Sequence, residues 1–172
     1  GTATPDIYKT VSDNVDQLGE IKPFDQNKHQ LEYFDIRYPY YDFLKLQVNL
    51  EVIKTLETPI YHEAVGGAGT GWLSEFFKYA GLPQTIIDLH PEPHPLFYGV
   101  NPEPLAINLG HAIATLEHEK QGIVICSDGD ADRIGVVLAG GKFFNPHQIF
   151  AVLLDHLYRK GIKGNVVKTF TV

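Results

Sequence analysis

An uninterrupted apolar run at residues 122–126, Gly-Ile-Val-Ile-Cys, restricts the fold more than any other segment of the chain. A strand with one face in water alternates apolar and polar residues, whereas a strand of a parallel sheet is covered on both faces and is apolar throughout. The run therefore predicts a buried strand of a parallel sheet. Such sheets carry helices on their faces, so the expected fold class is α/β.

Helical and extended patterns alternate along the rest of the chain, as this fold class requires. Apolar spacing predicts helices that begin near Pro5, Pro39, Trp72, Leu105 and Pro146, the second of them continuing through Ile53. Strands are expected at 59–62, 84–88, 122–126, 134–138, 142–144 and 165–169. The fourth and fifth strands flank Ala-Gly-Gly and should pair as a hairpin. We therefore expect a mainly parallel sheet flanked by helices.

The strongest chemical signal is Ser127-Asp-Gly-Asp-Ala-Asp-Arg133, which follows the buried strand directly. Its carboxylates, Asp128, Asp130 and Asp132, alternate with very small residues and can converge on one point. Their mutual repulsion disfavours ionisation unless a cation offsets it, and Mg²⁺ prefers carboxylate oxygens. Ligands of open α/β sheets bind at the carboxyl ends of strands, so we predict that these residues bind Mg²⁺. Arg133 adds a guanidinium fork that suits a phosphate.

Three other interpretations of this acidic loop compete with a magnesium site. An EF-hand would require Gly at the sixth position and Glu at the twelfth, where the chain has Arg133 and Ala139, and this excludes it. The stretch also resembles the start of a haloacid-dehalogenase phosphatase with Asp128 as nucleophile, although Asp132 occupies a position where that family has Thr or Val. The third interpretation is a solvated acidic turn.

Composition excludes several classes of protein. Of the 172 residues, 44% are hydrophobic and 20% are charged, which is a globular balance rather than that of a disordered chain. The formal net charge of -7 argues against nucleic acid as a partner, and no apolar run approaches the ~18 residues that a membrane span needs. Cys126 is the only cysteine, which excludes an internal disulfide and a cysteine zinc site and is typical of the reducing cytoplasm.

Three further groups of residues have both a structural and a functional interpretation. The glycine cluster at 66–71 could hold a phosphate at a helix N-terminus, but it matches no phosphate-binding pattern, and a tight strand-to-helix turn is favoured. His90 and His94 lie in a proline-rich segment and are expected at the surface rather than on zinc. His111 and His118 are expected on the polar face of one helix.

The loop Asp128-Gly-Asp-Ala-Asp-Arg133 resembles the metal-binding loop of the α-D-phosphohexomutases, the superfamily of phosphoglucomutase and phosphomannomutase. The resemblance covers most of the chain, and its pattern is closest to bacterial phosphoglucomutases. Further similar segments are Tyr41-Asp-Phe-Leu-Lys45, Val48-Asn-Leu-Glu51, Glu63-Ala-Val-Gly-Gly-Ala-Gly69, Pro95-Leu-Phe-Tyr-Gly99, Asn101-Pro-Glu-Pro104 and Val167-Lys-Thr169. Within them, Glu63 stands where the family has Asp, and Gly66 stands where it has His or Tyr.

This resemblance implies an isomerase of carbohydrate metabolism that works by intramolecular phosphotransfer. Such enzymes interconvert glucose 1-phosphate and glucose 6-phosphate through a phosphoserine and a hexose bisphosphate, in four domains around one cleft. The resemblance also implies that Asp128, Asp130 and Asp132 bind Mg²⁺ and that Arg133 is a catalytic residue that steadies the transferred phosphate. The fold is then the three-layer α/β/α type of the family's second domain.

The same resemblance divides the chain into the tail of a first domain (1–38), the metal-binding second domain (39–160) and the start of a third (161–172). The chain has no Met and no Ser-His-Asn-Pro, the motif that carries the family's nucleophile. We therefore expect a fragment whose partners are the remaining domains and a phosphorylated hexose, and which has no mutase turnover alone. A stand-alone, non-catalytic metal or phosphosugar binding module is the alternative.

Overall fold

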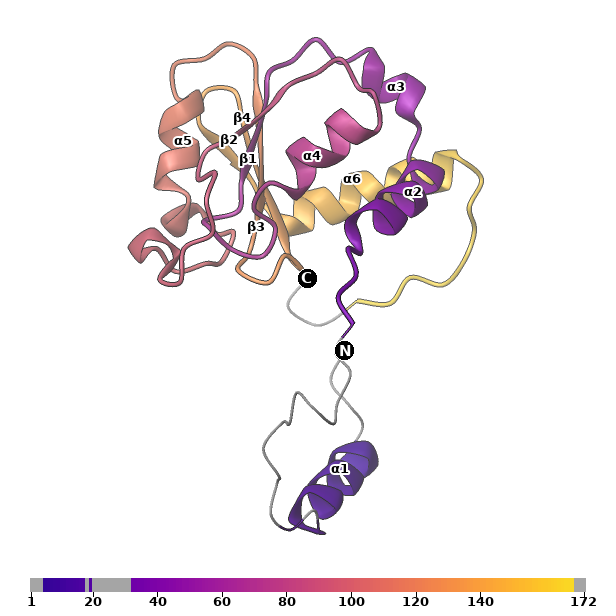
Figure 1. Cartoon of the computed structure of the whole chain (residues 1–172). Coiled ribbons are helices and arrows are strands. Elements are labelled where there is room, and N and C mark those ends of the chain that lie inside the picture. Colours follow the sequence, from indigo (N-terminus) through magenta and orange to yellow (C-terminus); the bar gives the residue numbers. More distant parts are fainter. Residues whose placement is uncertain (1–4, 18, 20–31, 169–172) are drawn as a thin grey trace. The chain divides into compact units, whose positions relative to one another are not determined.

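The computed structural model describes residues 5–17, 19 and 32–168, and it divides the chain into two compact units, Gly1–Ile36 and Arg37–Val172 (Figure 1). In the first unit, helix α1 (Pro5–Gln17) begins at the proline that the sequence predicts. The apolar position expected at Leu18 lies outside the described residues. Within these described ranges, none of the helices is long and apolar enough to cross a membrane.

The second unit is built on a five-stranded sheet with the strand order β2-β1-β3-β4-β5. The strands are β1 (Ile60–Glu63), β2 (Ile86–Asp88), β3 (Ile123–Ser127), β4 (Ile134–Leu138) and β5 (Lys142–Phe144). β1 runs parallel to β2 and β3, whereas β4 is antiparallel to both β3 and β5. The predicted hairpin is thus confirmed, and the sheet is half parallel and half antiparallel.

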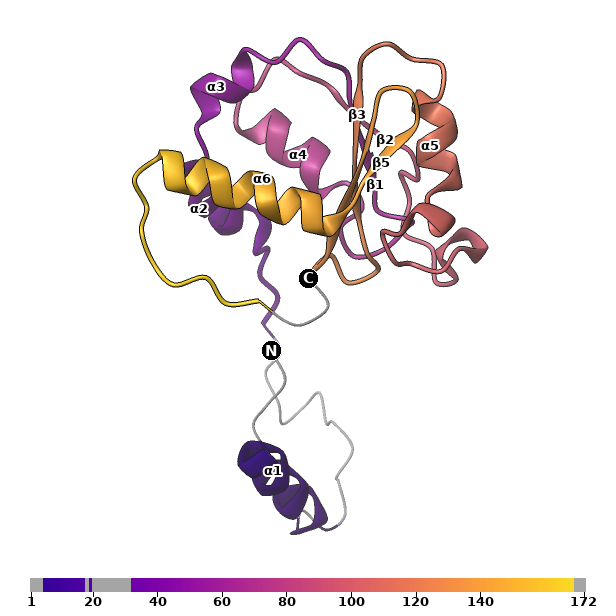
Figure 2. The same cartoon turned by 180° about the vertical axis from the view of Figure 1, so that it is seen from behind.

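Helices cover both faces of this sheet (Figures 1 and 2). One face carries α2 (Arg37–Gln47), α3 (Leu50–Lys54), α4 (Trp72–Tyr79) and α6 (Pro146–Arg159), and the other carries α5 (Gly110–Leu116). Two short 3-10 turns, Phe97–Gly99 and Ala106–Asn108, precede α5. This three-layer arrangement confirms the predicted α/β fold class.

Strand β3 supplies side chains to the cores on both sides of the sheet. Val124 and Cys126 are completely buried on the α5 side, and Ile123 and Ile125 pack against the core beneath α2 and α4. Burial of one such aliphatic side chain contributes roughly 1.5–3 kcal/mol to stability. The double coverage explains why the sequence is apolar throughout this strand and does not alternate.

Three predicted elements differ from the structure. The helix expected to begin near Leu105 is α5, which begins at Gly110 after the 3-10 turn Ala106–Asn108 and ends at Leu116, so His118 does not share a helix with His111 as expected. The single helix expected to continue through Ile53 is two helices, because the Asn49 side chain accepts a hydrogen bond from the Val52 backbone N–H at 3.3 Å and caps α3. An Asn side chain that bonds the backbone in this way competes with helix continuation. The prediction of a strand at 165–169 is wrong for residues 165–168, since residues 162–168 have no regular structure and are exposed. Thr169 lies outside the described residues.

Candidate functional site

The carboxyl ends of β1 and β3 lie side by side, because Glu63 pairs with Cys126 in the parallel register. The loops that follow these strands also touch, and the Ala68 backbone N–H donates to the Gly129 carbonyl oxygen at 2.9 Å. A Cβ on Gly67 would lie 2.6 Å from that same oxygen, so this position requires glycine. The glycine cluster therefore forms the tight strand-to-helix turn that the sequence favours, and it packs directly on the acidic loop.

The buried carboxylate of Asp128 organises the acidic loop. Its Oδ1 accepts hydrogen bonds from the backbone N–H groups of Asp132 (2.9 Å) and Arg133 (3.0 Å), and its Oδ2 accepts one from Arg133 Nε at 2.6 Å. Burial alone would raise the pKa of Asp128, but the hydrogen bonds from Arg133 outweigh it and lower the pKa below its ordinary value. Asp128 is therefore a carboxylate at neutral pH.

The structure brings the three predicted metal ligands together. One carboxylate oxygen from each of Asp128, Asp130 and Asp132 lies within 4.8 Å of the others, and the latter two side chains are exposed. The negative charge of Asp130, followed by that of Asp128, raises the pKa of Asp132. A cluster of carboxylate oxygens whose negative charges repel one another fits a hard divalent cation such as Mg²⁺. Asp128 still has a lone pair on Oδ2 to contribute, because that oxygen accepts only one of its three hydrogen bonds.

Arg133 links the acidic loop to the loop that precedes α5. Besides the bond to Asp128, its Nη1 donates to Glu103 Oε1 at 3.0 Å. These two hydrogen bonds raise the pKa of the guanidinium, which is therefore charged at every relevant pH. Two of its nitrogens are thus engaged with carboxylates, although the side chain is 55% exposed. Glu103 is a site residue that the sequence reasoning missed. Its segment, Asn101-Pro-Glu-Pro104, was noted only for its resemblance to the family.

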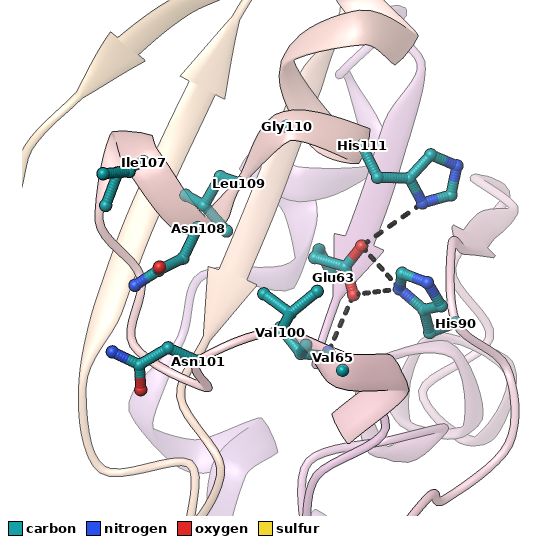
Figure 3. Close-up of a pocket in the computed structure, with 11 residues that line it drawn as sticks. Glu63, Val65, His90, Val100, Asn101, Ile107, Asn108, Leu109, Gly110 and His111 are labelled. Atoms are coloured by element: carbon teal, nitrogen blue, oxygen red, sulfur yellow. Dashed lines mark hydrogen bonds and ion pairs between the residues drawn. The ribbon is translucent and has the colours of Figure 1, made fainter. Parts of the chain in front are cut away.

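A second cluster of polar side chains lies on the α5 side of the same sheet edge (Figure 3). It joins Glu63 at the end of β1, His90 after β2 and His111 in the first turn of α5. The sequence analysis placed His90 at the surface, but this side chain is only 19% exposed and bonds to Glu63. Linear spacing carries no signal for this cluster, since its members come from three different elements. His94 instead accepts hydrogen bonds from the backbone N–H groups of Leu96 and Tyr98, which is a structural role.

Comparison with known proteins gives a consistent result. A family model described as phosphoglucomutase/phosphomannomutase, alpha/beta/alpha domain II, matches residues 38–141. The phosphoglucomutase/phosphomannomutase of Thermococcus kodakarensis is 29% identical over 135 residues, which are 78% of this chain and 29% of that protein. A Pyrococcus abyssi protein assigned as a phosphoglucosamine mutase is 32% identical over 103 residues, which are 60% of this chain and 23% of that protein.

Solved structures show the same relationship. A crystal structure assigned to a phosphomannomutase from Thermus thermophilus matches with a TM-score of 0.74 and 44% sequence identity, over 76% of this chain and 30% of that one. A phosphoglucomutase/phosphomannomutase family protein from Burkholderia thailandensis matches with a TM-score of 0.59 and 26% identity, over 75% of this chain and 27% of that one. The chain thus spans less than a third of the length of these relatives.

Proposed function

Because this chain belongs to the phosphoglucomutase/phosphomannomutase family, whose α/β/α domain II it contains, we propose that it is the metal-binding domain of a phosphohexose mutase. The proposed reaction interconverts glucose 1-phosphate and glucose 6-phosphate through a phosphoserine enzyme and a bisphosphate intermediate. The single observation that carries the proposal is the convergence of Asp128, Asp130 and Asp132 at the carboxyl end of β3. This is the edge at which ligands of such sheets bind.

In this proposal the three aspartates would hold Mg²⁺. When bound, the cation would supply positive charge that offsets the charge of a phosphoryl group in transit. The chain's own contribution is to fix the donors, and the backbone N–H groups of Asp132 and Arg133 do so by holding Asp128. Arg133 holds the same carboxylate and presents a permanent positive charge beside the site, where it would steady the phosphate.

The partners in this proposal are the remaining domains of a longer parent chain and a phosphorylated hexose. Residues 1–38 would end a first domain, 39–160 would form the second and 161–172 would begin a third. The family match over 38–141 falls inside the proposed second domain apart from residue 38. A free, buried Cys126 supports a reducing compartment, and we propose the cytoplasm.

A phosphatase that uses Asp128 as its nucleophile is disfavoured by the structure. This side chain is completely buried, and both of its oxygens accept hydrogen bonds that shape the loop. These hydrogen bonds leave one lone pair on Oδ2, which we propose binds the metal. Asp132 also speaks against a phosphatase, because that family has Thr or Val at this position.

Titration of the 172-residue chain with Mg²⁺ by calorimetry tests the metal site. We expect weak binding of one ion, and Asp130→Asn and Asp132→Asn should each abolish it, because each removes one of three charged donors. Asp155→Asn on α6 is the matched control, since this exposed aspartate pairs with Arg159 one helical turn away. Equal Mg²⁺ binding by the parent chain and the three variants would contradict the proposed metal site.

The proposed reaction is tested with the longer protein that is encoded by the reading frame around this sequence. A longer chain with an upstream Ser-His-Asn-Pro should convert glucose 1-phosphate to glucose 6-phosphate, and Asp130→Asn should abolish the conversion. The 172-residue chain alone should show no mutase turnover above a buffer blank. Turnover of a generic phosphate ester by this chain alone would instead support a phosphatase.

A further inference from the structure

The carboxylate of Glu63 is buried at the end of β1 and faces two imidazole rings (Figure 3). Its Oε1 accepts a hydrogen bond from the Val65 backbone N–H at 2.7 Å, which fixes the carboxylate plane. His90 Nδ1 lies 2.8 Å from both carboxylate oxygens, and His111 Nδ1 lies 3.6 Å from Oε2. Three potential ligand atoms from distant parts of the chain thus converge within 4.8 Å of one another.

We propose that Glu63, His90 and His111 form a second metal site, distinct from the acidic loop, which takes Zn²⁺ or a similar divalent transition metal. The donor set of two imidazoles and one carboxylate is characteristic of zinc. Imidazole nitrogen suits such metals, whereas Mg²⁺ prefers oxygen alone. The chemistry of the donors therefore separates this site from the all-carboxylate cluster of Asp128, Asp130 and Asp132.

The distances between the donor atoms fit a tetrahedral ion. With metal–ligand bonds of about 2.0–2.1 Å, two ligand atoms of a tetrahedral site lie roughly 3.3 Å apart. The two observed Glu63–histidine distances, 2.8 and 3.6 Å, lie on either side of that value. Changes of about half an ångström or less would bring these two distances to the tetrahedral value.

The surroundings hold the ligands in place and leave one side open. The His90 ring packs against Tyr98 with the ring centroids 4.3 Å apart, and against His111 at 4.9 Å. A cavity of about 380 Å³ borders all three proposed ligands and is also lined by Asn101 and Asn108. Three protein ligands with an open fourth position leave room for water or another small donor.

The site would connect three segments that are far apart in the sequence. Glu63 ends β1, His90 follows β2 and His111 begins α5, so one ion would cross-link the sheet edge to the helix that covers it. The proposal does not depend on a mutase reaction. It concerns only side chains within this chain, and metal binding can be measured without substrate.

The test is a Zn²⁺ titration of the 172-residue chain against a competing chelator dye, in excess Mg²⁺ to saturate the acidic loop. We expect one Zn²⁺ per chain. His90→Ala and His111→Ala should each weaken binding at least 100-fold, because changes to residues that merely support a metal ligand already cost 10–100-fold in affinity. His118→Ala, just past the end of the same helix, is the matched control and should bind like the parent.

Two further measurements keep the outcome independent of folding. His111 is 55% exposed, so its variant should retain the far-ultraviolet circular dichroism and melting temperature of the apo chain. Co²⁺ substitution should give the intense visible bands of a four-coordinate site in the parent and in His118→Ala, but not in His111→Ala. Absence of Zn²⁺ binding, or equal affinity in a folded His111→Ala variant, would overturn the proposal and leave Glu63 as the acceptor of an ordinary ion pair.

Discussion

Arg133 Nε donates a hydrogen bond to Asp128 Oδ2 across 2.6 Å, and this pair joins a half-exposed guanidinium to a fully buried carboxylate. The energetic cost of losing this hydrogen bond differs between the two partners. Arg133 can be solvated when its partner is removed, but Asp128 cannot, and a buried acceptor left without its partner costs about 1–3 kcal/mol.

Replacement of Arg133 by Ala should therefore lower the free energy of unfolding by about 1–3 kcal/mol, measured by urea denaturation. Arg159→Ala is the control, since Arg159 and Asp155 are both exposed and such pairs contribute about 0–1 kcal/mol. Equal effects of the two substitutions would mean that Asp128 does not depend on Arg133.

The contact between the glycine turn and the acidic loop leads to a second prediction. A methyl group on Gly67 would meet the Gly129 carbonyl oxygen at 2.6 Å, and this overpacking should destabilise Gly67→Ala by about 1–3 kcal/mol. Displacement of Gly129 should also disturb its neighbours Asp128 and Asp130, and Mg²⁺ affinity should fall. Gly164→Ala is the control, because among the described residues no atom beyond its chain neighbours lies within 4 Å of the added Cβ. A destabilised Gly67→Ala variant with unchanged Mg²⁺ affinity would show that the two loops are not coupled.

The core beneath α5 can be tested at Leu116, which is completely buried. Leu116→Ala removes three buried carbon atoms and leaves a cavity against Gly122, so we expect a loss of about 2–5 kcal/mol in the free energy of unfolding. Leu46→Ala makes the same chemical change at a side chain that is 82% exposed, and its effect should stay within about 0.5 kcal/mol. Both values come from chemical denaturation, and similar losses would contradict the assignment of the core.

Burial raises the pKa of the Cys126 thiol from its ordinary value of 9.0 to about 12. Because the unfolded thiol ionises first, the unfolded state gains stability from ionisation as pH rises from 9 to 12. The free energy of unfolding should therefore fall through this window, and the slope should be smaller in Cys126→Ala.

Alkylation provides a direct readout of the same thiol. At pH 8 the buried thiol of the folded chain stays protonated, so iodoacetamide should label it far more slowly than the thiol of the urea-unfolded chain. Labelling of the folded chain at the unfolded rate would show that Cys126 is accessible and not buried beside β1.

Local patterns predicted the elements that depend on local chemistry. The apolar run gave β3, the turn residues gave the β4–β5 hairpin, and Asn145 with Pro146 gave the start of α6, where the side chains of Asn145 and Gln148 form a reciprocal cap. The acidic loop was also visible, because its three aspartates are close in sequence as well as in space.

The parts that escaped prediction depend on contacts between distant segments. Glu103 reaches Arg133 from 30 positions away, and Glu63 meets His90 and His111 only after β1, β2 and α5 have come together. The break at Asn49 was hidden for a different reason, since apolar spacing continues through it and the capping hydrogen bond decides the boundary. Side-chain hydrogen bonds of this kind leave no periodic trace.

The antiparallel pairing of β3 with β4 anchors the acidic loop at both of its ends. Ser127 pairs with Ile134, so residues 128–133 span the whole distance between two adjacent strands. A shift of β4 by one place would turn the fully buried Val137 toward the opposite face of the sheet. The register therefore fixes where the loop begins and ends, and the three aspartates lie between two anchored strands.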